Sequence, residues 1–181
     1  MPGARKAYSN FGYLLLGLVI EEVTGGDATA WTREHIMGGQ EEFAIARSLP
    51  ADRDPREPPY FDPAPPTASV FGEGRPVAAP DGTWPNEVME AHGGWRSSAR
   101  GNTEFLTRYW IGGAPRPAGA RGFTYRFNGS LPGTWAVARQ RPDGISFTVL
   151  LNQRKDASGK SYEEIAKVLD AAIDAMRKPQ G

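Results

Sequence analysis

The pattern that most constrains the fold lies in the C-terminal half, where two apolar segments flank the turn sequence Pro-Asp-Gly at residues 142–144. Asp-Gly between such segments is a strong signal for a β-hairpin, because glycine accepts the backbone conformation that a tight turn needs. We therefore predict strands at residues 134–141 and 145–152, preceded by a third at residues 123–128. Apolar and polar residues alternate in the last strand, which indicates that one of its faces is buried.

A helical pattern follows these strands. Ser161 and Glu164 have the spacing of a capping box, and apolar residues then repeat with a helical period as far as Met176. Pro179 is expected to end this helix. An antiparallel meander with a packed C-terminal helix, together with the helices and loops before it, predicts the α+β fold class. A length of 181 residues suits one domain and is too short for two of ordinary size.

An apolar segment at residues 11–20 dominates the N-terminal part. We predict a helix over residues 10–24, capped by Ser9 or Asn10 and ended by Gly25. Because its first half is apolar all round, we expect contact with protein on several sides. The segment is too short to span a bilayer, and glutamates follow it rather than a small-residue cleavage site, so neither a membrane span nor a signal peptide is predicted.

Proline dominates the stretch that follows the N-terminal helices. Seven prolines lie within residues 50–66, where they forbid helix, but Tyr60 and Phe61 favour an ordered loop over a disordered linker. Two further helices are predicted, at residues 28–37 and from Ser97 or Ser98 to about Trp110. We divide the single domain into a helical segment (1–49), an ordered Pro-rich loop (50–92) and a segment holding a helix, the strands and the C-terminal helix (93–181).

Composition excludes several classes of function. The 21 basic and 21 acidic residues balance, and a nucleic-acid or anionic-membrane partner would need a basic excess. Cysteine is absent, which removes disulfides and thiolate metal sites. His35 and His92 lack the spacing of metal ligands, so neither a metal nor another cofactor is expected. The sequence does not indicate a compartment.

Three short motifs could carry chemistry, and each has an ordinary structural alternative. Tyr8 lies just before a helix N-terminus, where free N–H groups favour a phenolate, but it could simply pack there while Asn10 caps the helix. Residues 127–133 (FNGSLPG) could present a backbone N–H to an oxyanion, or could be a plain turn between strands. Residues 92–95 (HGGW) could line a cleft, or could lead into a helix with a core tryptophan.

Taken together, the order of the motifs resembles the family of serine β-lactamases, D-alanyl-D-alanine peptidases and related esterases. The resemblance runs from YSN and FGYLLLG at residues 8–17, through GGW and SSAR at 93–100, to NGSLPGTWA at 128–136 and RPDG at 141–144. The YSN motif that opens an LLLG helix is its most distinctive part. The resemblance implies a partial β-lactamase/transpeptidase-like fold, of which this chain would hold the C-terminal portion.

The resemblance also implies roles for individual residues. Tyr8 matches the tyrosine that assists as general base toward the nucleophilic serine, and Asn10 matches an asparagine that faces the substrate and the catalytic lysine. Ser130 matches the residue whose backbone N–H helps to hold the oxyanion. The residues expected to contact the substrate are Gly94, Trp95, Asn128 and Gly129.

This chain departs from the family pattern in two ways. The family's third motif begins with a basic residue, where this chain has Phe127, so an ester or another neutral acyl substrate is favoured over one anchored by a carboxylate. The family's nucleophile is the serine of Ser-x-x-Lys, and none of the nine serines here is followed by lysine three positions later. We therefore expect a truncated hydrolase that lacks the nucleophile, its lysine and the family's first strands, and no covalent turnover by this chain alone.

Three functions remain open at this point. The first is a portion of a serine hydrolase that acts on a small acyl substrate when its N-terminal half is supplied. The second is a non-catalytic binding module that keeps the cleft wall, and the third is a freestanding esterase that uses another serine such as Ser130. For the first we expect an exposed sheet edge at residues 145–152 and an uncovered apolar patch, which favour a homo-oligomer or pairing with the missing half.

Overall fold

A three-stranded antiparallel sheet forms the centre of the molecule. The computed structural model describes residues 4–5, 7–72 and 74–177. The strands lie in the order β5 (Tyr125–Leu131), β6 (Thr134–Gln140) and β7 (Ser146–Leu151). Together with the four α-helices of the described residues they confirm the predicted α+β class and its meander.

The helix α4 (Ile165–Arg177) packs on one face of this sheet and covers the central apolar cluster. Alternate side chains of β6 and β7 point to this face, because side chains alternate along a strand. Trp135 pairs with Leu151, and Val137 pairs with Val149. Trp135, Val137 and Ala166 are 3%, 1% and 1% exposed, so the predicted packing of the C-terminal helix on the strands is confirmed.

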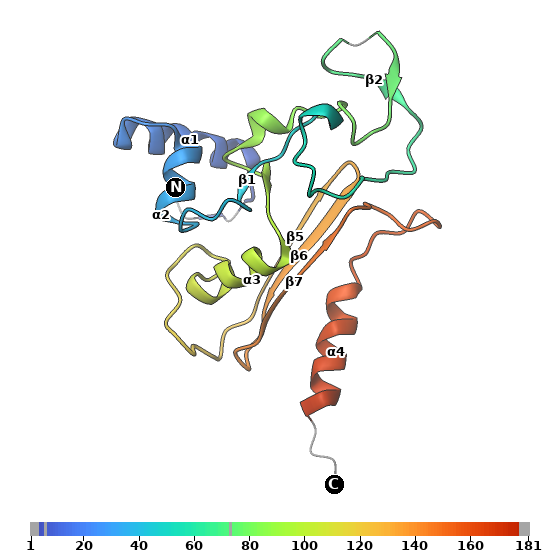
Figure 1. The fold of residues 1–181 in the computed structure, drawn as a ribbon. Helices are drawn as coiled ribbons and strands as arrows, with labels where there is room; N and C mark the ends of the chain where they lie inside the picture. The colour runs from blue at the N-terminus through green and yellow to red at the C-terminus, as the bar shows by residue number, and fades with distance from the viewer. Residues whose placement is uncertain (1–3, 6, 73, 178–181) are drawn as a thin grey trace.

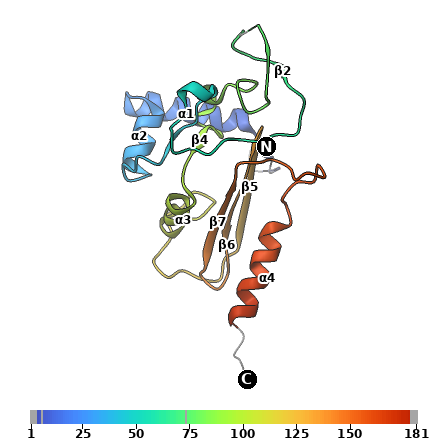
Figure 2. The ribbon, with the colours of Figure 1, turned by 45° about the vertical axis from the view of Figure 1, so that its right-hand side comes forward.

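The helix α3 (Ala99–Arg108) covers the opposite face, as Figures 1 and 2 show. A buried glutamine joins the two layers. The side-chain amide of Gln140 donates to the carbonyl oxygens of Leu106 (2.9 Å) and Tyr109 (2.7 Å), and its own oxygen accepts from the Ile111 N–H (2.9 Å). Because each polar atom of this amide has a partner, a fully buried polar side chain is tolerated here.

An ion-pair network ties α4 to the end of β6. The guanidinium of Arg141, whose side chain is 8% exposed, pairs with Asp143 (3.0 Å), with Asp170 (2.8 Å) and with Asp174. Its hydrogen bond lowers the pKa of Asp143. Burial alone would raise the pKa of Asp170, but hydrogen bonds from Arg141 and Arg139 hold it below the ordinary value. The network is therefore charged at neutral pH.

The first helix, α1 (Asn10–Thr24), has the predicted boundaries. Ser9 caps it by accepting from the Gly12 N–H (3.1 Å), and Gly25 ends it with a φ of 69°. The expected contact on several sides is not found among the described residues, where Gly17 is the one buried residue of the helix. A Cβ at Gly17 would lie 2.7 Å from the Ala91 Cβ, so the helix backbone rests directly on that segment.

The next helices are shorter than predicted. α2 (Ala28–His35) is capped by Asp27 and ends two residues before the predicted Met37, because the chain turns into Gly38 and Gly39, both with positive φ. α3 begins after the cap Ser98, as predicted, and ends at Arg108.

The Pro-rich stretch follows the end of the sheet. It opens with the 3-10 helix η1 (Pro50–Asp52). The Asn152 side chain donates to the Pro59 carbonyl (2.7 Å), the Phe61 N–H donates to the Asn152 carbonyl (2.9 Å), and the Gly133 N–H donates to the Asp62 carboxylate (3.1 Å). These bonds hold residues 59–62 against one end of the sheet, at Asn152 just after β7 and at the turn between β5 and β6.

Short elements complete the fold. They are β1 (Ala44–Ile45), paired with β4 (Trp95–Arg96); β2 (Thr67–Ala68), paired with β3 (Pro76–Val77); and the 3-10 helix η2 (Asn86–Met89). No helix within residues 4–5, 7–72 and 74–177 is long and apolar enough to cross a membrane.

Two local predictions are corrected by the structure. The strand predicted at residues 123–128 runs over Tyr125–Leu131, so Asn-Gly at 128–129 lies inside a strand and Pro-Gly at 132–133 forms the turn. The predicted capping box at α4 is wrong: the helix begins at Ile165, and Ser161 forms a β-bridge with Lys155. Pro179, expected to end this helix, lies outside the described residues.

Candidate functional site

The start of α1 lies beside the edge strand β5. The ring of Tyr8 is 6.2 Å from the ring of Phe127 and 5.7 Å from that of Tyr13, measured between centroids. Tyr8 and Phe127 are exposed by 62% and 49%. On the helix side of Tyr8 is an open hollow of about 470 Å³. The motif that contains Tyr8 and the motif that begins at Phe127 thus meet at one surface, where Tyr8 is accessible.

Asn10 is the first residue of α1 and is exposed. Ser9 provides the helix cap, so the structural alternative in which Asn10 caps the helix is wrong. Among the hydrogen bonds between described residues, none uses the Asn10 side chain. The Asn10 side chain therefore lies near Tyr8 and makes no hydrogen bond to a described residue that would stabilise this part of the chain.

The outer edge of β5 presents backbone groups to the open side of the sheet. No strand of the described part of the chain pairs with this edge. Leu131 and Thr134 flank the two-residue turn and form its closing pair, and hydrogen-bonded and non-hydrogen-bonded pairs alternate along an antiparallel ladder. Ser130, opposite Trp135, falls in a non-hydrogen-bonded pair, so its N–H points away from β6.

Gly129 lies next to this N–H. Neither crowding nor backbone conformation explains why this position holds a glycine. Its φ is not positive, and a Cβ added there would meet nothing within 4 Å. Glycine weakens a strand interior and often marks a site of close approach by a ligand or another backbone. No described residue fills the space in front of Gly129, so a ligand or another backbone has room to approach the strand there.

Asn128, predicted to contact the substrate, is directed elsewhere. It pairs with Val137, which faces α4, and its side-chain oxygen accepts from the Arg126 guanidinium at 3.2 Å. Its side chain therefore lies on the opposite face from Gly129 and Phe127.

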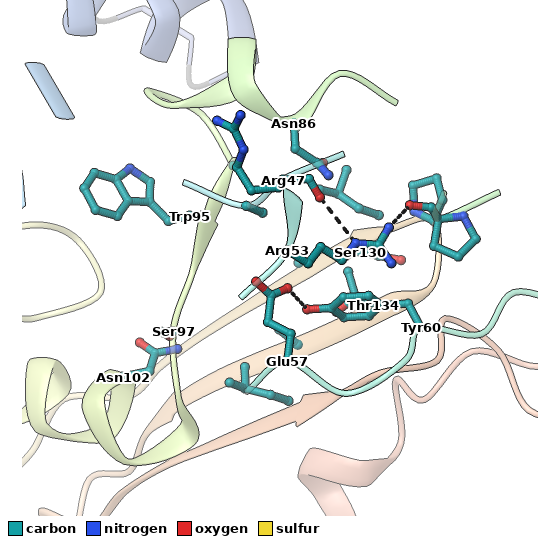
Figure 3. Close-up of a pocket in the computed structure, with 18 residues that line it drawn as sticks. Arg47, Arg53, Glu57, Tyr60, Asn86, Trp95, Ser97, Asn102, Ser130 and Thr134 are labelled. Carbon is teal, nitrogen blue, oxygen red and sulfur yellow. Dashed lines mark hydrogen bonds between the residues drawn. The ribbon is translucent and has the colours of Figure 1, made fainter. Parts of the chain in front are cut away.

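A cavity of about 270 Å³ lies beside Gly129 and Ser130. Figure 3 shows it between the end of the sheet, the β4 segment and the Pro-rich loop. Trp95 forms part of its wall, with the indole N–H donating to the Glu90 carbonyl at 2.7 Å. Three of the seven predicted site residues, Trp95, Gly129 and Ser130, line this cavity.

Gly94 is buried behind this wall. A Cβ there would lie 2.6 Å from the Asn86 carbonyl oxygen, so glycine is required for the chain to pass η2. This contact gives Gly94 a packing reason that is independent of any substrate.

Sequence reasoning missed the residues of the Pro-rich loop that line the cavity. The Arg53 guanidinium lies over the Tyr60 ring, 5.1 Å from its centroid, and pairs with Asp81 at 2.9 Å. The Tyr60 hydroxyl donates to Glu57 at 2.8 Å. Burial, together with this bond, raises the pKa of Tyr60, so the phenol stays neutral. The two aromatics in a Pro-rich stretch were the available signal, but nothing local indicated which surface they would meet.

Among the residues whose positions are known, no group of three or more histidine, aspartate and glutamate side chains is arranged to hold a metal ion. The groups at the cavity and at Tyr8 are instead hydroxyls, amides, aromatic rings and paired charges.

The structure is similar to the crystal structure of D-amino acid amidase from Ochrobactrum anthropi SV3 complexed with D-phenylalanine, with a TM-score of 0.61 and 17% sequence identity. The match covers 96% of this chain and 60% of the amidase chain, so this chain spans well under two thirds of the amidase's length. That amidase belongs to the penicillin-binding protein/β-lactamase superfamily. No family model matches the sequence. The likeness establishes the expected partial fold.

Proposed function

We propose that this chain is the C-terminal portion of a serine hydrolase of the β-lactamase/penicillin-binding-protein type, and that residues outside these 181 supply the nucleophile. The observation that carries the proposal is the meeting of Tyr8, at the start of α1, with the open edge of β5 at Phe127. An exposed hydroxyl and a strand edge that carries an outward N–H are two of the parts that acyl transfer needs.

In this proposal Tyr8 assists as general base and takes the proton of the attacking serine. The serine oxygen bonds to the acyl carbon, and the Ser130 N–H stabilises the negative charge that develops on the carbonyl oxygen. The proton passes on to the departing amine or alcohol, and water then releases the acyl group by the same route. Asn10 is proposed to face the substrate beside Tyr8.

The proposed substrate is a neutral acyl compound. Phe127 occupies the position of the family's basic residue, so β5 offers no cation there for a carboxylate. The amidase with the similar fold acts on amides and was crystallised with D-phenylalanine, which makes uncharged amides with an aromatic acyl group the first compounds to test, beside simple esters.

The missing part is proposed to cover α1. Phe11, Leu18 and Val23 are exposed by 68%, 54% and 79%, an unusual state for such side chains on one helix. Among the described residues no further strand pairs with the outer edge of β7, which is a second surface that an added strand would complete. In the absence of that part, we expect the chain to self-associate through these surfaces. A concentration-independent monomer in analytical ultracentrifugation would contradict this expectation.

The test is complementation. The DNA upstream of the Met1 codon is read for an in-frame or adjacent segment that encodes Ser-x-x-Lys, and the chain is assayed alone and with that segment, using a fluorophosphonate probe and p-nitrophenyl acetate. We expect no label on the chain alone and label on the added serine in the mixture. Tyr8→Phe should lower the rate of the mixture about 100-fold, the lower end for a lost general base, whereas Tyr13→Phe, a neighbouring exposed tyrosine, should not.

The other outcomes identify the alternatives. Label on Ser130 in the chain alone, removed by Ser130→Ala, would mean a freestanding esterase. Saturable amide binding without turnover in any mixture would mean a binding module. Absence of any Ser-x-x-Lys segment that restores labelling would overturn the proposal.

A further inference from the structure

We propose that the cavity beside Gly129 binds the uncharged, largely apolar acyl substituent of the substrate and so determines which acyl groups are accepted. This inference rests on the proposed function, because it takes the carbonyl carbon to lie at the Ser130 N–H. It assigns to the Pro-rich loop a direct part in substrate selection.

The volume suits one substituent rather than a whole ligand. The cavity holds about 270 Å³, just below the roughly 300–1,000 Å³ of pockets that enclose a drug-sized molecule. Its end is closed where a Cβ on Gly133 would lie 2.7 Å from Pro80 and 2.9 Å from Tyr60. The substituent therefore enters from the Gly129 side and stops at the Pro-rich loop.

The charged side chains that line the cavity are already paired. Arg53 binds Asp81 (2.9 Å), Arg47 lies 3.7 Å from Glu87, and Glu57 lies 3.2 Å from Arg96 while accepting from the Tyr60 hydroxyl. A charged substituent would have to enter a confined space with no counter-charge released for it, and that desolvation is costly. A neutral substituent avoids the cost.

The walls offer apolar contact. Tyr60 contributes an aromatic ring, and aliphatic surface comes from Leu131, Ala136 and Leu150. Figure 3 shows Tyr60 near Glu57 and Thr134, whereas the Trp95 ring points away from these residues. Flat or branched apolar groups gain most from such walls, because aromatic rings present large, rigid contact areas.

Gly129 provides the entrance. It lines the cavity, has ordinary φ, and leaves its Cβ position open. A side chain there would project into the entrance without disturbing the strand. Gly129→Ala thus separates ligand binding from folding.

The experiment uses three amides that differ only in the acyl substituent: phenylacetamide (neutral), succinamate (negative) and 3-aminopropanamide (positive). Each is titrated into the purified ¹⁵N-labelled chain, and the backbone amide signals of Gly129, Ser130 and Trp95 are followed by NMR. We expect phenylacetamide to shift these signals with a dissociation constant on the order of 1 mM, and both charged amides to bind at least about tenfold more weakly.

Variants locate the site. Gly129→Ala should weaken phenylacetamide binding at least fivefold with an unchanged melting temperature, and Ala136→Leu should abolish it by filling the cavity. Ala138→Leu is the matched control, since Ala138 lies one pleat along the same face of β6 and outside the cavity. If Ala136→Leu fails to fold, Gly129→Ala decides the matter alone.

Equal or tighter binding of a charged amide, shifts confined to Tyr8 and α1, or no binding at all would overturn the inference. None of these measurements involves a nucleophile. A failure of complementation therefore leaves their result intact, and an active complemented enzyme with an unresponsive cavity would refute this inference alone.

Discussion

Two apolar regions of this chain differ in how far their side chains are buried. In the sheet with α4, Trp135 and Val137 are 3% and 1% exposed, whereas on α1 Phe11 and Val23 are 68% and 79% exposed. Both regions have patterns that predict burial, and α1 even has its predicted boundaries. The difference shows that an apolar pattern predicts that a surface will be buried but does not say by what. Within the described residues, the apolar faces of α4 and the sheet cover each other, whereas nothing covers most of α1.

The largest expected effect is a difference in the unfolding free energy lost when an aromatic side chain is removed from each of the two regions. Trp135→Ala removes a buried aromatic side chain and is expected to cost about 4 kcal/mol of unfolding free energy. Phe11→Ala, an aromatic deletion on the exposed face of α1, should change it by less than about 0.5 kcal/mol. Urea unfolding measures both. A comparable loss for Phe11→Ala in a monomeric sample would mean that α1 is buried after all.

The second test concerns what holds α4 to the sheet. Arg141→Met leaves three aspartates without their shared cation and should cost about 3 kcal/mol, as when one partner of a buried pair is removed. Arg100→Met, in the exposed pair with Glu104, is the control and should cost less than about 0.5 kcal/mol.

This network also predicts an acid dependence. Because Arg141 holds the pKa values of Asp143 and Asp170 below their ordinary range, its contribution is present above the unfolded pKa of about 4 and is lost as pH falls through the lower folded values. Melting temperatures between pH 7 and pH 2 should fall more steeply for the parent than for Arg141→Met. Parallel curves would show that the aspartates are not coupled to the arginine.

The smallest effects distinguish a closed position from an open one on the same hairpin. Gly133 has a φ of 74° and no room for a Cβ, so Gly133→Ala should cost about 2 kcal/mol. Gly129→Ala has room and ordinary φ, and should stay within about 0.5 kcal/mol of the parent. A large loss at Gly129 would mean that the edge of β5 is more crowded than the structure shows.

Local signals accounted for the parts of the fold that depend on local chemistry. A serine before an apolar run and a glycine after it gave the limits of α1, and Asp-Gly at 143–144 gave the β6–β7 turn, where the Arg141 N–H donates to the Ile145 carbonyl at 2.8 Å. Two turn signals, Asn-Gly at 128–129 and Pro-Gly at 132–133, competed at β5, and Pro-Gly formed the turn, because Gly133 takes the positive φ that Gly129 does not need.

The candidate site was predictable only in part, because it is assembled from distant segments. Gly129, Ser130 and Trp95 were found from motif order, whereas Arg53 and Tyr60 reach the cavity through contacts that no local pattern encodes. The direction of Asn128 required the register of β5 with β6, since a shift of one residue would have turned it toward the cavity. Their proposed roles remain predictions that the variants above test.

The segment from Met89 to Trp95 contacts α1 and also lines the cavity beside Gly129. On one side Ala91 abuts the α1 backbone at Gly17, and the Thr29 hydroxyl of α2 donates to Glu90 at 2.8 Å. On the other side the Glu90 carbonyl accepts the indole N–H of Trp95, a residue that lines the cavity. Seven residues thus connect the surface of α1 to the wall of the cavity, and we predict that a partner which displaces α1 also moves Trp95.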